Sequence, residues 1–214
     1  MYNSQFNEDK FIYENYLNYE NGFFIELGAM DGSFGSNSKF FEDTLKWTGI
    51  LIEPTTQFND LIINRPNCIN FNYAISDKKG DAAFLGTGGF PFTAVGGLLE
   101  TMPELHKDIW NLHVQQPITV KTIPFNELTN NLDIELVDFF SIDVEGAEFE
   151  VLKTFDWNIP VYLILIELHG YDTKKDEECR KFLLDKGFTF ETYIGPKEVP
   201  TLNEIWINKN NKRK

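Results

Sequence analysis

Carboxylates stand near the ends of apolar runs in the amino-terminal part of this 214-residue chain. Glu26 and Asp31 flank the glycine-containing loop after the first run. Glu53 ends a second run about twenty residues beyond that loop, where doubly wound folds place an acid on ribose hydroxyls. Carboxylates attract positive charge and accept hydrogen bonds from hydroxyls, but they suit a pyrophosphate poorly. These residues indicate a ligand with ribose hydroxyls and an ammonium or sulfonium group, and S-adenosylmethionine has all of these.

A second group of side chains has the chemistry to move a proton. Asp143 ends one apolar run, and Glu167 and His169 end another. Glu167 and His169 point to the same side of a strand because they are two residues apart. Since unperturbed imidazole titrates at about pH 6.5, we expect His169 to be the general base for a hydroxyl acceptor, oriented by Glu167 or Asp143. The same three residues also match a divalent metal site, which we rank second to the metal-free base.

Strands must bring these side chains to one edge of a sheet. The runs that begin at Phe23, Gly49, Val137 and Tyr162 are short, apolar and bounded by turn residues, which is typical of strands buried on both faces of a parallel sheet. Such sheets bind nucleotides at the carboxyl ends of their strands. Further elements are expected as helices over 36–47, 55–64, 147–154 and 176–186, and as strands over 68–74, 118–123, 188–194 and 203–208.

The order of the glycines argues against a dinucleotide cofactor. Gly28, Gly32 and Gly35 do not follow the Gly-x-Gly-x-x-Gly fingerprint. Gly28 and Gly32 instead permit positive φ and a close approach of the backbone to a ligand. An oxidoreductase that uses a nicotinamide cofactor is therefore disfavoured.

Several short motifs, taken in order, resemble the FkbM-type family of S-adenosylmethionine-dependent methyltransferases. The motifs are Ser4-Gln5 with Glu8-Asp9, the stretch 24–32, Ser36-Asn37, the stretch 49–54, Ala74-Ile75-Ser76 and the stretch 141–148. Each is weak alone, but their order and spacing over residues 4 to about 167 make the set specific. The resemblance implies one α/β domain over residues 1–214 with the class I methyltransferase (Rossmann-like) fold. In that fold a seven-stranded, mostly parallel sheet has helices on both faces and a C-terminal antiparallel hairpin.

Strand ends and the loops after them are expected to contact the cofactor. In a sheet of this type the end of the third strand borders the adenine, so Ile75 should pack on the ring and Ser76 or Asp77 should bind its amine. The resemblance places Ser4-Gln5 near the mouth of the site. The full set expected to bind the cofactor is Gln5, Glu26, Gly28, Ala29, Asp31, Gly32, Ser36, Asn37, Glu53, Pro54, Ala74, Ile75, Ser76, Asp143, Val144 and Glu145.

Residues 81–119 form the stretch with the least regular pattern. Glycines interleave there with aromatic residues such as Phe84, Phe90 and Phe92, which predicts an adaptable acceptor lid rather than a packed layer. Aromatic faces suit a sugar ring, whose C–H face is apolar. A dimer contact and a small core under a long loop are the open alternatives. His106 and His113, also in this stretch, are reserve candidates for the base.

Charge and composition restrict the partners. A formal charge of −14 and a pI near 4.6 disfavour nucleic acid, because polyanion binding relies on Lys and Arg. The basic run over 209–214 is expected to be a disordered tail. Cys68 and Cys179 are expected to be buried free thiols. With no export signal and no apolar run of about eighteen residues, we expect a cytoplasmic protein without membrane contact, and a homodimer stays open.

The sequence favours an O-methyltransferase that acts on a sugar hydroxyl of a glycan or glycosylated metabolite, with a deoxyhexose such as rhamnose as the narrower expectation. FkbM-like proteins are similar in that role, and an aromatic, glycine-rich lid fits a neutral acceptor. Two alternatives stay open. One is methylation of a non-sugar hydroxyl such as that of a polyketide, and the other is a non-catalytic ligand-binding module of the same fold.

Overall fold

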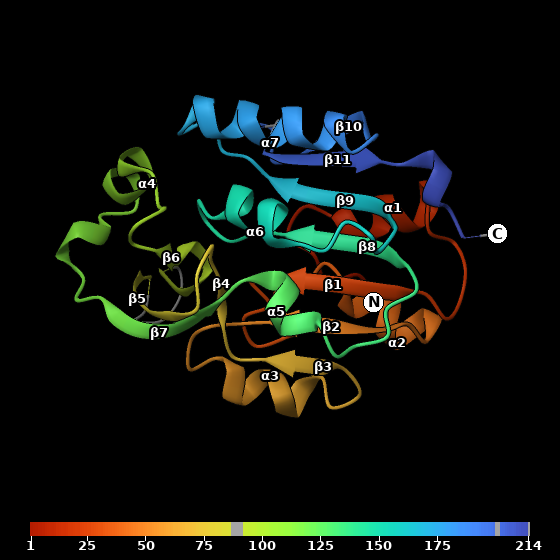
Figure 1. Ribbon diagram of the computed structural model, residues 1–214, viewed down its shortest axis with the longest axis horizontal. Coiled ribbons are helices and arrows are strands. Elements are labelled where there is room, and N and C mark those ends of the chain that lie inside the picture. Colours follow the sequence, from red (N-terminus) through yellow and green to blue (C-terminus); the bar gives the residue numbers. More distant parts are fainter. Residues whose placement is uncertain (87–91, 200–201, 214) are drawn as a thin grey trace.

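A seven-stranded sheet forms the centre of the structure, a computed structural model that describes residues 1–86, 92–199 and 202–213 (Figure 1). Its strand order is β10-β11-β9-β8-β1-β2-β3. β11 pairs antiparallel with both β10 and β9, and the other neighbouring strands of this sheet pair in parallel. This is the predicted mostly parallel sheet with a C-terminal antiparallel hairpin, so the fold class is confirmed. The strands are β1 (Phe23–Leu27), β2 (Thr48–Ile52), β3 (Ile69–Phe71), β8 (Val137–Ile142), β9 (Val161–Glu167), β10 (Thr189–Ile194) and β11 (Asn203–Ile207).

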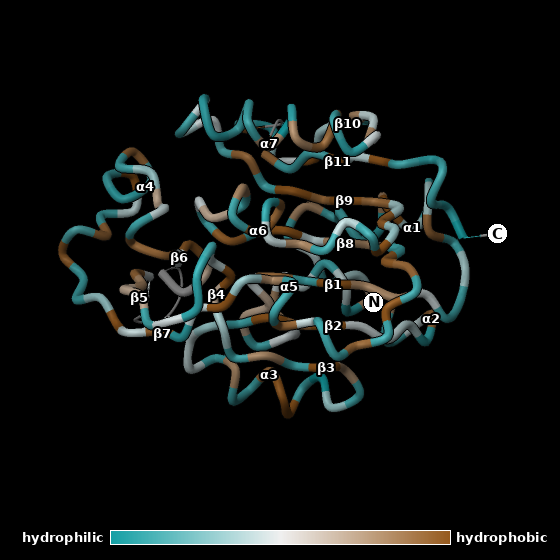
Figure 2. Tube along the Cα trace, viewed as in Figure 1, coloured by the Kyte–Doolittle hydropathy of each residue, from teal (hydrophilic) through white to brown (hydrophobic). Residues whose placement is uncertain are grey.

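Alternate residues of the central strands pack into two cores on opposite faces of this sheet. Figure 2 shows the hydrophobic residues in brown along β1 and β9. One core joins Phe24 of β1 to helices α1 (Glu8–Asn15), α2 (Lys39–Leu45) and α3 (Phe58–Asn64). The other joins Ile25 to helices α5 (Phe125–Thr129), α6 (Glu148–Thr154) and α7 (Thr173–Asp185). Burial on both faces explains why these strands are continuous apolar runs. No helix within the described ranges has the length and hydropathy needed to cross a membrane.

A second, four-stranded sheet lies beyond the arrowheads of β1, β8 and β9 (Figure 1). Its strand order is β4-β7-β5-β6, and β5 pairs antiparallel with β7. Short helical segments η1, α4 and η2 follow β5 and precede β7. Their bounds are β4 (Ala74–Ile75), β5 (Gly80–Leu85), η1 (Phe92–Val95), β6 (Gly97–Leu98), α4 (Glu104–Ile109), η2 (Leu112–Val114) and β7 (Ile118–Ile123).

The sequence predicts an adaptable lid without a packed layer over residues 81–119, but the described part of this stretch contains packed side chains. Leu85, Val95, Met102 and Leu112 form a small buried core. This core is the alternative of a small core under a long loop that the sequence left open. The sequence could not decide for it, because the pairing of β5 with β7 joins segments that are far apart along the chain. Phe90, an aromatic residue of the predicted lid, lies outside the described residues, and the acceptor-lid role stays a prediction.

The C-terminal tail also differs from the expectation of disorder. Residues Lys209–Asn211 form a short 3-10 helix, η3, and Arg213 donates to the carboxylate of Asp138 at 2.8 Å. Asp138 is fully buried in β8 and also accepts a hydrogen bond from the Tyr19 hydroxyl at 2.8 Å. A buried carboxylate requires charged or hydrogen-bonding partners, and the basic tail supplies one. Lys214 lies outside the described residues.

The two cysteines are free thiols, as predicted. Cys179 is buried, whereas Cys68 is half-buried. Burial raises the pKa of the Cys68 thiol to about 12, so this thiol is un-ionised at neutral pH and a weak nucleophile.

The loop after β1 passes very close to the end of β8, so we predict that Gly28→Ala destabilises the fold. Gly28 has φ 73°, and a Cβ there would lie 2.1 Å from the Asp143 carbonyl oxygen. The left-handed conformation and the overlap together should lower the free energy of unfolding by about 3 kcal/mol or more. Chemical denaturation measures this loss.

Gly35→Ala is the matched control. Gly35 has a similar φ of 67°, but its added Cβ would meet no atom of the described residues within 4 Å. We expect a loss of only about 1 kcal/mol there, from the backbone conformation alone. Equal losses of unfolding free energy in Gly28→Ala and Gly35→Ala would contradict the close approach of Gly28 to the Asp143 carbonyl oxygen.

Candidate active site

A cleft opens between the carboxyl ends of β1, β2 and β8 and the second sheet. Its strand-end wall carries the carboxylates of Glu53 and Asp143, and its opposite wall is apolar. A ligand with one polar and one apolar part fits these two walls. The residues that form the apolar wall include Ala74, Ile75, Phe84 and Leu98.

Half of the residues expected to bind the cofactor line this cleft. These are Gly28, Glu53, Pro54, Ala74, Ile75, Asp143, Val144 and Glu145. The other half lie outside its walls: Gln5, Glu26, Ala29, Asp31, Gly32, Ser36, Asn37 and Ser76. Ser76 lies instead beside a separate surface hollow on the second sheet.

Glu53 is fixed in the wall of the cleft by backbone and side-chain donors. Its carboxylate accepts hydrogen bonds from the Met30 amide at 3.0 Å, the Thr55 amide at 2.8 Å and the Thr55 hydroxyl at 2.5 Å. Burial raises its pKa, while these hydrogen bonds act in the opposite direction. A carboxylate with two oxygens accepts about four hydrogen bonds, so Glu53 retains capacity for a ligand hydroxyl.

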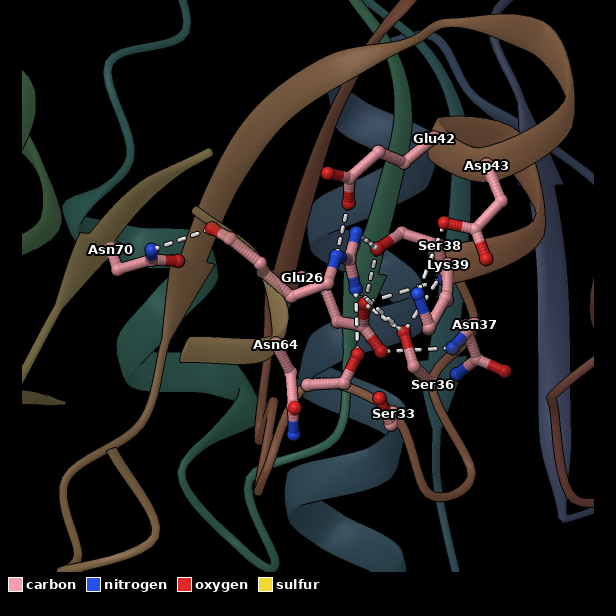
Figure 3. Close-up of polar contacts among 12 residues, drawn as sticks. Glu26, Ser33, Ser36, Asn37, Ser38, Lys39, Glu42, Asp43, Asn64 and Asn70 are labelled. Carbon is pink, nitrogen blue, oxygen red and sulfur yellow. Dashed lines mark hydrogen bonds and ion pairs between the residues drawn. The ribbon is translucent and has the colours of Figure 1, made fainter. Parts of the chain in front are cut away.

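Glu26 has a different setting from the one that we predicted. It follows Ile25 on β1 and therefore points to the opposite face, toward α2. There its carboxylate accepts from the Ser36 hydroxyl at 2.9 Å, the Asn37 amide at 2.8 Å and the Ser38 hydroxyl, as Figure 3 shows. Glu26 thus orders residues 36–38 rather than facing the cleft.

Asp31 also acts on the loop. Its Oδ1 accepts hydrogen bonds from the amides of Ser33 and Phe34, both at 2.8 Å. This is the turn-forming behaviour of an Asp side chain. Asp31 therefore stabilises the glycine loop from outside the cleft.

A buried arginine completes this loop network. The Arg65 side chain is fully buried and contacts the Glu42 carboxylate. It also donates to the Gly32 carbonyl at 3.0 Å, the Ser36 hydroxyl at 3.1 Å and the Ser38 hydroxyl at 3.0 Å. The loop that follows β1 is held by charge-assisted bonds on the face opposite the cleft.

Five ionisable side chains meet beside the cleft, and we call them the acid–histidine cluster: Asp143, Glu145, Glu167, His106 and His169. Asp143 and Glu145 follow β8, Glu167 ends β9, and His106 comes from α4. The three carboxylates each place an oxygen within 4.8 Å of the others. The predicted trio of Asp143, Glu167 and His169 is therefore brought together.

The direct partner of His169 is Glu145, which we had expected only to contact the cofactor. His169 Nε2 lies 2.8 Å from Glu145 Oε2 and 3.7 Å from Glu167 Oε1. Its ring stacks on Tyr171 with the ring centroids 4.7 Å apart. These contacts fix the imidazole at the edge of the cleft, because Glu145 lines both the cleft and the adjoining hollow that His169 lines.

The reserve histidines differ in their positions. His106 is 1% exposed, its Nε2 lies 3.0 Å from the Val95 carbonyl oxygen, and its Nδ1 lies 3.5 Å from Glu145 Oε2. His113 is exposed and pairs with Asp108 at 2.9 Å. Only His106 belongs to the cluster. Nothing in its local sequence distinguishes it from His113, because the fold of the second sheet decides which of the two is buried.

Burial controls the protonation of the cluster. It raises the pKa of Glu145 to about 7, against the hydrogen bond with His169, and it raises the pKa of Glu167 well above its ordinary value. Burial lowers the pKa of His169, but the hydrogen bond and charge of Glu145, together with the charges of Asp143 and Glu148, outweigh that effect and the net shift is upward. Burial lowers the pKa of His106. A carboxyl group with a pKa of about 7, such as that of Glu145, can exchange protons near neutral pH.

We predict that Arg65→Met destabilises the fold by about 3–5 kcal/mol, because the substitution leaves the Glu42 carboxylate in place without its buried partner. The Arg65 and Glu42 side chains are 0% and 12% exposed. Urea denaturation of the variant measures the loss.

Lys46→Met is the comparison for this substitution. Lys46 pairs with Glu20 at the surface, where the two side chains are 73% and 57% exposed. Surface pairs contribute about 0–1 kcal/mol, so this variant should unfold almost as the parent does. A loss at Arg65 no larger than that at Lys46 would show that the loop does not depend on the network.

The comparison with protein families identifies a methyltransferase domain in this chain. The model of the methyltransferase FkbM domain family matches residues 26–190. No curated protein matches the chain. Solved structures with similar folds include fibrillarin from Aeropyrum pernix with bound S-adenosyl-L-methionine, at 12% identity and a TM-score of 0.44 over 88% of this chain and 66% of that chain.

Two further structures are similar at the same level. The first is M. capricolum TrmK with S-adenosyl-homocysteine, at 12% identity and a TM-score of 0.47 over 92% of this chain and 66% of that chain. The second is a TehB-like methyltransferase from Corynebacterium glutamicum, at 8% identity and a TM-score of 0.45 over 94% of this chain and 87% of that chain. This chain therefore spans about two thirds of the length of fibrillarin and TrmK.

The family match covers most of the chain, including the end of β1, all of β2, β8 and β9, and the loops that line the cleft. It confirms the predicted family and supports S-adenosylmethionine as the methyl donor. The chain belongs to the FkbM family of methyltransferases.

Proposed function

We propose that this protein transfers the methyl group of S-adenosylmethionine to a hydroxyl of a sugar in a glycan or glycosylated metabolite. A deoxyhexose such as rhamnose is the narrower proposal. The observation that carries it is the shared wall between the cleft and the acid–histidine cluster, since Asp143 and Glu145 line the cleft. A donor in the cleft would have groups that handle protons directly beside it.

In this proposal each wall of the cleft binds a different part of the methyl donor. The Glu53 carboxylate accepts one hydrogen bond from the ribose 2′-hydroxyl. The apolar wall that includes Ile75 and Leu98 packs on the adenine. Asp143, at the end of β8, attracts the positive sulfonium and thereby orients the methyl group toward the cluster.

Methyl transfer is an in-line displacement that requires alignment and a partner for the acceptor proton. The hydroxyl oxygen attacks the methyl carbon while the carbon–sulfur bond breaks. The electron pair of that bond stays on sulfur, so the sulfonium becomes a neutral thioether. The hydroxyl proton passes to the cluster as the new bond forms. His169, Glu167 and Asp143 either accept this proton directly or hold a cation that lowers the hydroxyl pKa.

A neutral acceptor fits the charge of the site. The cleft and cluster carry carboxylates, and the whole chain has a formal charge of −14, which disfavours phosphate-bearing acceptors such as nucleic acid. An apolar wall with nearby carboxylates is compatible with a sugar, which has an apolar face and a hydroxylated rim. A polyketide also offers a hydroxyl as the reacting group, so an acceptor assay must distinguish a sugar acceptor from a polyketide acceptor.

We predict that S-adenosylhomocysteine binds to the protein and that Glu53→Gln weakens this binding by about 10- to 100-fold, because a charge-assisted hydrogen bond contributes about 1.5–3 kcal/mol. A 2′-deoxyribose analogue of the ligand should bind the variant and the parent with nearly equal affinity. Calorimetric titration of both proteins with both ligands gives the coupling energy.

Two results of this titration would contradict the proposal. Equal losses for the two ligands would mean that Glu53 acts only through the Met30 and Thr55 contacts. Absence of any S-adenosylhomocysteine binding would remove the enzymatic function for sugar and non-sugar acceptors together and leave the non-catalytic module.

We predict that His169→Ala lowers methyl transfer by about 100- to 10,000-fold, the range expected for loss of a group that handles the acceptor proton. Transfer of labelled methyl groups to a panel of simple glycosides, with a rhamnoside included and a macrolide aglycone for comparison, measures this. S-adenosylhomocysteine affinity should stay within about 2-fold of the parent, because the His169 ring is not part of the cleft wall.

His113→Ala is the control, since His113 is exposed and pairs with Asp108 outside the cluster. It should keep the parent's rate. Full activity in His169→Ala would contradict the role of the cluster, and methylation of the aglycone alone would favour the polyketide-type acceptor.

A further inference from the structure

The acid–histidine cluster carries more carboxylates than positive partners among the described residues. Asp143, Glu145 and Glu167 each place an oxygen within 4.8 Å of the other two. The nearby ammonium group of Lys175 bonds to two backbone carbonyls instead. Buried like charges repel one another and lose hydration. The cluster therefore favours a ligand that brings positive charge.

A buried imidazole nitrogen without a hydrogen-bond partner points into this cluster. His106 is 1% exposed, and its Nε2 donates to the Val95 carbonyl oxygen at 3.0 Å. The neutral ring then carries its lone pair on Nδ1. Within the described part of the chain this Nδ1 makes no hydrogen bond, although it lies 3.5 Å from Glu145 Oε2. Metal-binding histidines commonly donate their other ring N–H to a backbone carbonyl in this way.

The separations fit ligands that share one ion. Glu145 Oε2 lies 2.8 Å from His169 Nε2 and 3.5 Å from His106 Nδ1. Two ligand atoms bonded at about 2.0–2.2 Å, with angles between 90° and tetrahedral at the ion, lie about 3.0–3.5 Å apart. Small side-chain movements would therefore place all three atoms around a single ion.

We infer that His106 Nδ1, Glu145 Oε2 and His169 Nε2 bind one divalent metal ion, with Glu167 beside the site and a fourth coordination position left open. Two imidazoles with carboxylates favour a borderline first-row ion such as Zn²⁺ over Mg²⁺ or Ca²⁺, which prefer oxygen ligands. The inference rests on the proposed methyl transfer and identifies how the same site activates its acceptor. The sequence favoured His169 as a metal-free base over a divalent metal site, whereas this inference favours the metal site.

The ion would bind the acceptor hydroxyl at an open coordination position on the side of the cleft. A bound hydroxyl loses its proton more readily, because the ion stabilises the alkoxide. Asp143, which lines the cleft, is positioned to accept that proton. The alkoxide oxygen then bonds to the methyl carbon as the carbon–sulfur electron pair returns to sulfur, and His169 serves as a ligand rather than as the base.

Metal titration of the 214-residue chain tests this inference without relying on catalysis. After dialysis against EDTA, calorimetric titration with Zn²⁺ alone should give one equivalent of tight binding, and Co²⁺ should give a visible absorption spectrum typical of imidazole and carboxylate ligands. His106→Ala should lower Zn²⁺ affinity by about 100-fold or more, since loss of even an outer contact costs about 10- to 100-fold. His113→Ala should bind as the parent does.

Glu145→Gln is the second variant, because it preserves the side-chain shape and removes the charged ligand. It should also lose Zn²⁺ affinity, while circular dichroism and thermal unfolding report whether either variant is folded. Absence of stoichiometric Zn²⁺ binding by the parent, or equal affinity in His106→Ala and His113→Ala, would overturn the inference. S-adenosylhomocysteine binding by the EDTA-treated parent is measured in parallel, so failure of the metal site and failure of the proposed donor site are distinguishable.

Discussion

The close approach of the chain after β1 to the end of β8 is the constraint on which the cleft depends. Paired residues end at Leu27 and Ile142, and a Cβ at position 28 would lie 2.1 Å from the Asp143 carbonyl oxygen. Beyond this point the chain leaves β1 toward α2 on one face and leaves β8 toward α6 on the other. The separation of these connections opens a crevice at the strand ends, as in other doubly wound sheets.

The second sheet closes this crevice and adds chemistry to it. Its residues Phe84 and Leu98 supply an apolar wall opposite Glu53. Through α4 it also brings His106 against Glu145, which follows β8. The cleft and the acid–histidine cluster therefore both need residues from the two sheets.

Much of the fold follows from the sequence, because strands buried on both faces are continuous apolar runs and their ends locate Glu53 and Asp143. The sequence did not indicate that Glu26 faces α2 rather than the cleft, because a strand that is buried on both faces gives no sign of which face the ligand occupies. The role of His106 could not be predicted, because it depends on the pairing of β5 with β7. The contact of the tail with Asp138 did not follow from the sequence, because Asp138 is buried within a mostly apolar strand far from the tail along the chain.

A crystal structure of the complex with S-adenosylhomocysteine tests the central claim most directly. The account predicts the ribose 2′-hydroxyl on the Glu53 carboxylate, adenine against the wall that includes Ile75 and Leu98, and the sulfur atom beside Asp143 and facing the acid–histidine cluster. A ligand bound on the α2 face beside Glu26, or with its sulfur directed away from Asp143, would contradict it.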